Sequence, residues 1–468
     1  MLLLTLLLLP LVGAVLIAAW PGLGRRCAVR LAITWAIVPV AVVAAIGLQG
    51  GASWSLPWMP DANIHLAFKA DGTSWLFLFL TSLITLFSLA VSCKLNIGDR
   101  AYCTLILVME SMLFGVFTAT HFIPWFLCWE MTLIPAYLLI RLWGGKGAPR
   151  AALRFFVVTL AGGVCMLLGF LALQLSVGTM DLAELSRLAA NHELAASLAK
   201  SFSLDGHALL TVVAVAVFLG LAVKIPVVPF HAWLPDAYAE APTPVTILLT
   251  GLLLKMGVYG LLRVFLSIFP EVLLGLAALA VATVLLGALA AAHTDRAAMA
   301  SAVSGVVLQA FNHGVIAAVL FFGIGILETR SGGQRGFNDF GGLRARMPVF
   351  SGLMGLALFA SLGLPALSGF VGEFLIFNGV FGLVPWSAAI SVIGLLLTAV
   401  FLLRMIRKVF HGPLLSAMEK WTDLTVGERC LFEPAIALIV IPGLWPQVLL
   451  HFINGDTLRL LDLLHPIP

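Results

Sequence analysis

Charged residues are scarce in this sequence. Only 10% of its 468 residues are Asp, Glu, Lys or Arg, whereas 61% are hydrophobic. A soluble globular chain has about 25% charged and about 45–50% apolar residues, so this chain has too few charges to cover a surface that faces water. The scarcity excludes a soluble enzyme, a nucleic-acid-binding protein and a disordered chain, and it places the chain in a lipid bilayer.

Cysteine is also sparse, and its spacing fits no cofactor site. None of the six cysteines forms a C-x-x-C pair, and no histidine cluster accompanies them. Iron–sulfur, zinc and c-type haem sites need such groups of ligands. We therefore expect no metal and no bound cofactor, and we interpret most of the cysteines as small apolar side chains.

Long apolar runs are abundant. A transmembrane helix needs about 20 apolar residues to cross a hydrocarbon core of about 30 Å. Such runs lie near 1–20, 28–48, 72–93, 101–119, 121–143, 151–176, 207–229, 244–265, 271–292, 299–327, 347–382, 386–410 and 429–450. The sequence therefore predicts an all-α polytopic membrane protein with about 13 transmembrane helices. The first run could be a signal peptide, but no basic segment precedes it, and we interpret it as the first span.

Two of the predicted helices are interrupted. The segment 207–238 has Pro226 and Pro229 directly after Lys224, and the segment 347–382 has LGLPALSG at its middle. Pro and Gly break helices, and paired broken helices in corresponding places of two halves are typical of transporters built from repeats. A plain proline kink is the alternative interpretation.

Six ionisable residues lie within predicted spans. They are Glu110, Glu130, Lys224, Lys255, His313 and Glu373. A charge at the centre of a transmembrane helix costs at least about 2.5–3.5 kcal/mol, so such residues are functional candidates. A single buried pair could be a structural ion bridge, and His313 could simply bond a backbone carbonyl. A titratable set of both signs on several helices instead indicates a proton relay.

Other polar and aromatic residues have simpler interpretations. Arg263 and Arg404 fall near span ends, where we expect them to extend their charged groups to the interface. The tryptophans expected in interfacial belts are Trp54, Trp58, Trp125, Trp143 and Trp445. The polar segment 177–206 is expected to form short amphipathic helices at the membrane surface.

Basic residues in the loops predict the orientation. Clusters near 25–30, 141–154, 328–346 and 404–408 mark cytoplasmic loops, which places the N-terminus outside. Two cytoplasmic loops must be separated by an even number of spans, yet the odd number of predicted spans between residues 154 and 328 violates this parity. Either one segment is re-entrant or one span is missing.

The segment VKIPVVPFHAWLPDAYAEAPTPVTILLTGLLLKMGVYGLLR, which begins at Val223, resembles the antiporter-like membrane subunits of respiratory complex I, and the M type most of all. CWEMTLIPAYLLI, HGVIAAVLFF, NDFGGLRARMPVF and LGLPALSGFVGEF extend this likeness from about Asp71 to Trp445. Subunits of Mrp-type sodium/proton antiporters share many of these features.

The resemblance implies fourteen helices and two inverted repeats with one discontinuous helix each. It implies N-terminal helices in 1–100, a first repeat in 101–268, a second in 269–410, and a C-terminal helix and tail in 411–468. By motif, Glu130 and Lys224 match the family's glutamate–lysine pair, and Lys255 matches its central lysine. His313 matches the histidine of the HG motif. Glu373 matches the acid at the second broken helix, and Glu110 matches a further glutamate of the family.

The same resemblance implies a missing helix. Family members follow a TD motif with a complete helix, whereas here His293–Arg296 runs almost directly into AVSGVVLQAFNHG. The lost helix would carry the family's second central histidine, so the relay between Lys255 and His313 would lack a member. We expect a single crossing between Asp295 and Glu328.

The buried ionisable residues, taken with the resemblance, imply a proton-translocating membrane subunit, and the resemblance alone implies that it belongs to an NAD(P)H- or ferredoxin-driven quinone oxidoreductase. The chain would do no redox chemistry itself and would lie in an energy-transducing membrane, such as a bacterial inner membrane. Its partners would be other membrane subunits, including neighbouring antiporter-like chains, and the bilayer, but not nucleic acid. The alternatives are a cation/proton antiporter subunit of Mrp type and a non-conducting structural spacer.

Overall fold

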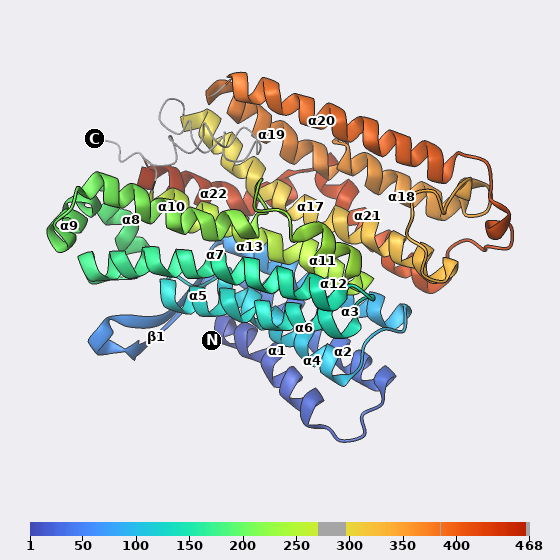
Figure 1. Ribbon diagram of the computed structural model, residues 1–468, viewed down its shortest axis with the longest axis horizontal. Coiled ribbons are helices and arrows are strands. Elements are labelled where there is room, and N and C mark those ends of the chain that lie inside the picture. Colours follow the sequence, from blue (N-terminus) through green and yellow to red (C-terminus); the bar gives the residue numbers. More distant parts are fainter. Residues whose placement is uncertain (270–295, 384, 465–468) are drawn as a thin grey trace.

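The computed structural model describes residues 1–269, 296–383 and 385–464. Long helices lie side by side and form one bundle, with α20 along one edge and α1 and α2 along the opposite edge (Figure 1). The expected span near 271–292 lies outside the described residues. An all-α polytopic membrane protein is confirmed, because nine helices in the described ranges are long and apolar enough to cross a membrane.

The helices of the first half follow in chain order. They are α1 (Leu2–Ala19), α2 (Arg25–Leu48), α3 (Gly72–Lys94), α4 (Arg100–Val116), α5 (Phe122–Met131), α6 (Leu133–Trp143), α7 (Ala148–Val177), α8 (Leu182–Ala190), α9 (Glu193–Phe202), α10 (Gly206–Lys224), α11 (Leu234–Glu240), α12 (Thr243–Leu248), α13 (Leu254–Gly260) and α14 (Leu266–Ile268). Two π-helical turns, η2 (Leu249–Leu253) and η3 (Leu261–Phe265), join α12, α13 and α14 into one apolar segment, Thr243–Ile268.

The second half begins with one long helix. Its elements are α17 (Arg296–Ser331), η5 (Leu343–Ala345), α18 (Pro348–Ser361), α19 (Ser368–Leu383), α20 (Pro385–Met405), the π turn η6 (Ile406–Phe410), α21 (Val426–Leu444) and α22 (Gln447–Leu464). Residues 296–331 thus form one helix, as the expected single crossing between Asp295 and Glu328 requires. The count of 13 spans is not confirmed. The last expected span, 429–450, is divided by a 64° bend between α21 and α22.

A β-hairpin interrupts the helical pattern between α2 and α3. Strand β1 (Ala52–Met59) pairs antiparallel with β2 (Ile64–Ala70). Asn63 adopts a left-handed backbone conformation after the turn (φ 53°), which asparagine tolerates better than most residues. The sequence analysis did not predict this hairpin, because its polar and aromatic residues alternate over too short a stretch to stand out among the long apolar runs.

Both predicted helix breaks are present. The first separates α10 from α11, and Lys224 is the last residue of α10. The indole of Trp233 returns from beyond this break and donates to the carbonyl of Val223 at 3.0 Å. The second separates α18 from α19, where Gly363 has a positive φ of 74°. Each break therefore ends a helix next to a residue of the candidate relay.

Small residues let α7 and α10 approach closely. Gly162 and Gly169 on α7 face Gly220 and Val217 on α10, and an added methyl group at Gly220 would lie 2.8 Å from the carbonyl oxygen of Gly162. Close approach at small residues is the usual way in which transmembrane helices pack. The contact holds α10, and with it Lys224, against the helix that faces Glu130.

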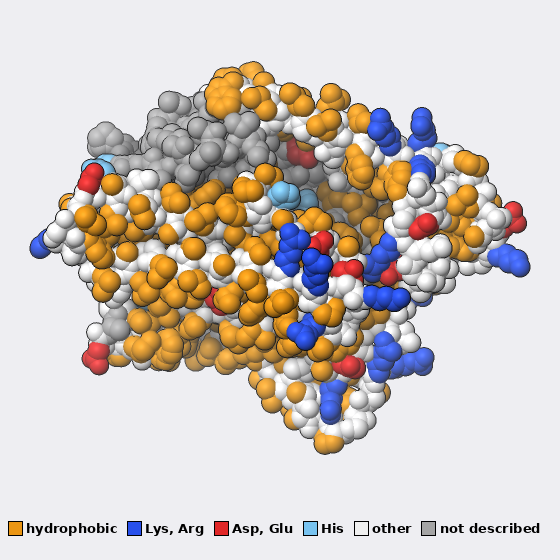
Figure 2. Space-filling view, in the orientation of Figure 1, with side chains coloured by type: hydrophobic (Ala, Val, Ile, Leu, Met, Phe, Trp, Pro, Cys, Tyr) orange, Lys and Arg blue, Asp and Glu red, His pale blue; other side chains and the backbone are white. Residues whose placement is uncertain are grey.

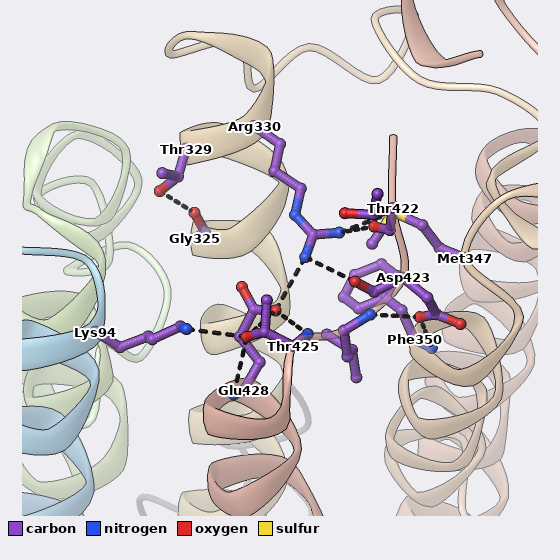
Figure 3. Close-up of polar contacts among 11 residues, drawn as sticks. Lys94, Gly325, Thr329, Arg330, Met347, Phe350, Thr422, Asp423, Thr425 and Glu428 are labelled. Atoms are coloured by element: carbon purple, nitrogen blue, oxygen red, sulfur yellow. Dashed lines mark hydrogen bonds and ion pairs between the residues drawn. The ribbon is translucent and has the colours of Figure 1, made fainter. Parts of the chain in front are cut away.

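The last turn of α17 is held by a polar network (Figure 3). Arg330 forms an ion pair with Glu428 at 2.9 Å and donates to the carbonyl of Asp423 at 3.3 Å. The carboxylate of Asp423 accepts from the backbone amides of Val349 and Phe350 at 2.7 and 3.1 Å. This carboxylate caps the start of α18, because the first amides of a helix lack partners within it. One network therefore positions α17, α18 and α21.

Basic residues gather at one end of the bundle. Figure 2 shows Lys and Arg mainly over the right half of the molecule, whereas the left half of this face is mostly hydrophobic. The loops 144–147, 332–347 and 411–425 and the helix ends beside them supply Lys and Arg. This asymmetry agrees with the basic clusters used to predict orientation, but the side of the N-terminus stays a prediction.

Two expectations for single residues were wrong. Trp125 is completely buried, whereas Trp58 and Trp445 are exposed as interfacial tryptophans should be. Arg263 does not extend freely to the interface, because it forms an ion pair with Asp71. The predicted amphipathic helices within 177–206 are confirmed as α8 and α9.

Candidate functional site

Lys255 lies at the middle of the bundle, on the apolar segment Thr243–Ile268, and is only 4% exposed. The π turn η2 directly precedes α13, which carries this lysine. A π turn alters the regular carbonyl ladder of a helix and occurs often at functional sites. The ammonium donates to the carbonyl of Thr250 at 2.9 Å and lies 2.8 Å from Nδ1 of His313. The lysine therefore has one fixed backbone partner and one titratable partner.

His313 lies on α17 and faces a groove, so its ring is exposed on one side. When Lys255 donates to Nδ1, the neutral ring carries its hydrogen on Nε2, the nitrogen left for another partner. The sequence analysis expected a member to be missing between these two residues. The structure instead joins them by a direct hydrogen bond. His313 is also not the backbone-bonded core histidine of the alternative interpretation.

Gln309 links His313 to Glu373. It lies four residues before His313 on α17, and residues at this spacing are neighbours on a helix surface. Its Nε2 donates to Oε1 of Glu373 at 3.4 Å. The sequence analysis missed Gln309 because it is neutral. Its spacing from His313 in the apolar segment LQAFNH was the signal that could have identified it.

Glu373 lies on α19, close to the second break. Its carboxylate abuts Gly363, and a side chain at that glycine would overlap it. Asn312 directly precedes His313 on α17, and its side-chain amide donates to the carbonyl of Ser368, the first residue of α19, at 2.6 Å. The neighbours of His313 on α17 thus hold both the start of α19 and its glutamate.

Glu130 and Lys224 form the second part of the site. Lys224 is 2% exposed, and its ammonium lies 5.4 Å from the ring centroid of Trp129 and 6.0 Å from that of Phe155. Such cation–π contacts partly replace lost hydration. In the part of the chain that the structure describes, neither Glu130 nor Lys224 has a hydrogen-bond partner. The expected pair is therefore not a closed ion bridge, and each buried group keeps the capacity to accept or donate.

Glu110 lies apart from these groups. It is fully buried on α4, and neither carboxylate oxygen has a hydrogen-bond partner among the described residues. The contacts of the structure do not connect it to the other five candidates.

A second polar cluster lies toward the opposite end of the same helix. Tyr259 lies one turn beyond Lys255, and its hydroxyl bonds Ser74 at 2.9 Å and the carbonyl of Phe117 at 2.8 Å. A further turn on, Arg263 pairs with Asp71, the residue that caps α3. The sequence analysis did not identify this cluster, because its members come from segments far apart in the chain.

The Asp71–Arg263 contact is electrostatically strong. Burial by itself raises the pKa of Asp71, but the charge of Arg263 and hydrogen bonds from Ser74 outweigh it and hold that pKa below its ordinary value. Asp456 on α22 accepts a hydrogen bond from the backbone amide of Thr73 at 2.9 Å and so belongs to the same cluster. The cluster therefore ties α3, the segment that carries Lys255, and α22 together.

Metal ligands are not grouped in the ranges that the structure describes. Within them, no three His, Cys, Asp or Glu side chains come together as a metal site would require.

Comparisons with known proteins agree on one family. The family model described as NADH:quinone oxidoreductase/Mrp antiporter, TM matches residues 119–296 and 294–398. The chain is 31% identical over 432 residues to "NADH-quinone oxidoreductase subunit M" of Rhodobacter capsulatus, which covers 86% of this chain and 83% of that protein.

Solved structures show the same fold. A chain of respiratory complex I from Thermus thermophilus with bound NADH superposes with a TM-score of 0.81 at 26% identity and covers 99% of this chain and 100% of that one. A chain of the Mrp complex from Dietzia sp. DQ12-45-1b gives a TM-score of 0.80 over 98% of this chain and 97% of that one, and at 21% identity it shows the fold alone. From the family-model match and the sequence relative together, the chain belongs to the NADH:quinone oxidoreductase/Mrp antiporter family of membrane subunits.

Proposed function

We propose that this chain is a proton-translocating membrane subunit of an NAD(P)H- or ferredoxin-driven quinone oxidoreductase. The relative from Rhodobacter capsulatus and the structural neighbour from Thermus thermophilus support the oxidoreductase over a stand-alone antiporter. The observation that carries the proposal is the 2.8 Å hydrogen bond between Lys255 and His313. It joins a buried lysine to a titratable ring on another helix, and such a contact can pass a proton.

The proposed relay runs along the bundle in one direction. When the Glu130 carboxylate approaches Lys224, it holds that lysine protonated. When the carboxylate withdraws, Lys224 releases its proton toward Lys255. Lys255 passes a proton to Nδ1 of His313, and the imidazolium ring then releases its Nε2 proton toward Glu373. Glu373, at the second broken helix, is the terminal acceptor.

Gln309 is a positioning residue in this proposal. An amide has no proton to give at neutral pH, so it cannot be a carrier itself. Gln309 lies one helical turn from His313 on α17, and its hydrogen bond holds the carboxylate of Glu373. A water molecule beside the amide would complete the connection, since bridging water is nearly as favourable as a direct hydrogen bond.

The energies involved are of matching size. Moving one proton against a membrane potential of 100 mV requires about 2.3 kcal/mol. A hydrogen bond to a charged group contributes about 1.5–3 kcal/mol. Making or breaking the Lys255–His313 contact is therefore sufficient to gate one step, provided that redox work in other subunits drives the change.

The remaining assignments follow from this role. Residues 101–268 and 269–410 would be the two inverted repeats, the second without one family helix after Asp295. The partners would be other membrane subunits, among them antiporter-like chains, in a bacterial inner membrane. The N-terminus would lie outside, with the basic end of the bundle in the cytoplasm. Electron transfer would take place in other subunits.

Proton pumping in membrane vesicles tests the relay. Glu130→Gln and Lys224→Ala each remove one titratable group, and both should abolish the proton gradient that this subunit contributes during substrate oxidation. Glu193→Gln and Lys200→Ala are matched controls on the surface helix α9 and should leave pumping unchanged. Unchanged pumping in both relay variants contradicts the assignment and favours the structural spacer.

The type of ion is tested in the same vesicles. A proton subunit should pump equally well in sodium-free and sodium-containing buffer. A sodium-dependent proton gradient that needs no electron donor would instead identify a cation/proton antiporter of Mrp type.

A further inference from the structure

A groove of about 430 Å³ opens beside α17. His313 lies at one end of it, and Ala317 and Ile324 continue along α17. Leu358 of α18 and Phe401 of α20 form the facing walls. Figure 2 shows this face of the molecule hollowed near its centre, with hydrophobic side chains around the hollow. We call it the α17–α20 groove.

The groove is long enough to cross one leaflet of a bilayer. Its floor follows one face of α17 from His313 to Leu327. These 14 residues span about 21 Å at a rise of 1.5 Å each, whereas half of a hydrocarbon core is about 15 Å. The groove therefore leads from mid-membrane to the level of the headgroups.

The walls of the groove are open to the hydrocarbon region. Ile324 is 40% exposed and Phe401 61% exposed, so large apolar surfaces face outward with nothing from this chain above them in the described ranges. A buried water needs two to four polar partners, and the long middle of the groove has none to offer. An apolar occupant fits better than a column of water.

The volume selects a narrow occupant. A helix with side chains is about 10 Å across, so a 21 Å length of it needs on the order of 1,600 Å³. A single hydrocarbon chain packed at carbon contact distances is about 5 Å across and needs roughly 400 Å³ over the same length. The groove accommodates the hydrocarbon chain over its full length, whereas a helix could place only one face in it.

The mouth of the groove carries unbalanced positive charge. Arg404, Arg407 and Lys408 lie at the end of α20 and in η6, next to the wall residues Met405 and Val409, and all three cations are exposed. No acidic residue occurs between Pro385 and His411. Within the described residues, neither Arg404 nor Arg407 has an ion-pair partner, and Lys408 contacts two neutral side chains, the amide of Asn338 and the ring of Phe337.

From this geometry we propose that the α17–α20 groove binds one acyl chain of an anionic phospholipid, with its phosphate held by Arg404, Arg407 and Lys408. The apolar walls take the chain, and the basic mouth takes the headgroup. The end of the acyl chain reaches His313, where it keeps bulk water away from the hydrogen bond between His313 and Lys255. This binding does not depend on the proposed proton relay.

Photolabelling of the purified complex in nanodiscs tests the proposal. The probes are phosphatidylglycerol and phosphatidylcholine with the same diazirine-bearing acyl chain, and labelled peptides are identified by mass spectrometry. Each Lys or Arg near an anionic surface contributes about 1 kcal/mol. With three cations at the mouth, the phosphatidylglycerol probe should therefore label residues 313–327 on the order of a hundredfold more than the phosphatidylcholine probe.

Two variants and one control make the test decisive. The triple variant Arg404→Gln/Arg407→Gln/Lys408→Gln should reduce labelling by phosphatidylglycerol to the phosphatidylcholine level. Ala317→Phe fills the groove and should reduce labelling by both probes. Arg26→Gln/Arg30→Gln removes two exposed cations from α2 and should change nothing.

Three results overturn the proposal. They are equal labelling of residues 313–327 by both probes, a headgroup preference that survives Arg404→Gln/Arg407→Gln/Lys408→Gln, and labelling of the exposed face of α7 as strong as that of the groove. Cross-linking of residues 313–327 to another polypeptide would equally show that a protein covers the groove.

Discussion

The ammonium of Lys255 lies 2.8 Å from Nδ1 of His313, although the two residues are 58 positions apart in the chain. A buried lysine on a helix next to a π turn thus meets an imidazole on the long helix α17. This contact is the junction between the two halves of the candidate site.

Replacement of His313 by asparagine distinguishes the hydrogen bond with Lys255 from proton transfer through the ring. The amide oxygen of Asn can still accept a hydrogen bond from Lys255, but it cannot carry a proton onward. We expect proton pumping to fall by about two orders of magnitude, the smaller end of what a positioned acid–base group contributes, with little change in thermal stability. His207→Asn, at the exposed start of α10, is the control. Normal pumping in His313→Asn would show that the ring does not carry protons.

Replacement of Gln309 by leucine tests the link to Glu373. Leucine has a similar volume but cannot donate, so the carboxylate of Glu373 loses its partner. Pumping should drop severalfold while the complex still assembles, and Gln309→Glu should not restore it, because a second carboxylate would repel the first. Gln174→Leu on α7 is the matched control. The measurement is the initial rate of vesicle acidification per electron transferred.

An added methyl group at Gly163 should disturb Glu130. The carboxylate packs against this glycine on α7, and the methyl group of Gly163→Ala would overlap Oε1. We expect Gly163→Ala to lower pumping as Glu130→Gln does, although no titratable group is lost. Gly394→Ala on α20 is the control, because a methyl group there meets nothing within 4 Å. Equal activity of the two glycine variants would show that the position of Glu130 is unimportant.

Loss of Arg330 should destabilise the protein rather than the relay. Arg330→Gln leaves Glu428 with a side chain only 10% exposed and without its cation. Breaking such a buried pair costs about 3 kcal/mol, so the thermal midpoint should fall by several degrees. Arg154→Gln breaks the exposed pair with Asp236, where the side chains are 47% and 53% exposed, and should cost less than about 1 kcal/mol. Similar melting curves for the two variants would contradict the role given to the network.

The Asp71–Arg263 contact should make stability depend on pH in one direction. The pKa of Asp71 is lower in the folded protein than its ordinary value, so its stabilisation is complete above that ordinary value and is lost as the pH falls through the folded pKa. Asp71→Asn keeps the cap of α3 but removes the charge. The difference in thermal midpoint between wild type and Asp71→Asn should therefore be largest near pH 7 and shrink below about pH 4. A difference that is constant with pH would assign the effect to packing.

The candidate carriers could be named from sequence because each departs from its surroundings. A lysine or glutamate in a run of apolar residues is costly in a membrane, and so Glu130, Lys224, Lys255, His313 and Glu373 stand out. Gln309 does not stand out, because it is neutral, and its role depends on the position of Glu373 on another helix. The sequence did not predict the Asp71–Arg263 contact for a related reason, since each residue alone resembles an ordinary charged residue at a helix end.

The sequence by itself determined that the chain lives in lipid, where its helices run and where two of them break, because hydrophobicity and Pro/Gly punctuation act locally. Only the tertiary structure decided which charges meet. It joined Lys255 directly to His313 and left Glu130 and Lys224 without hydrogen-bond partners among the residues that the structure describes. It also opened the groove beside α17 and bent the chain between α21 and α22. These outcomes depend on how helices distant in the sequence pack against one another, and no local pattern encodes that packing.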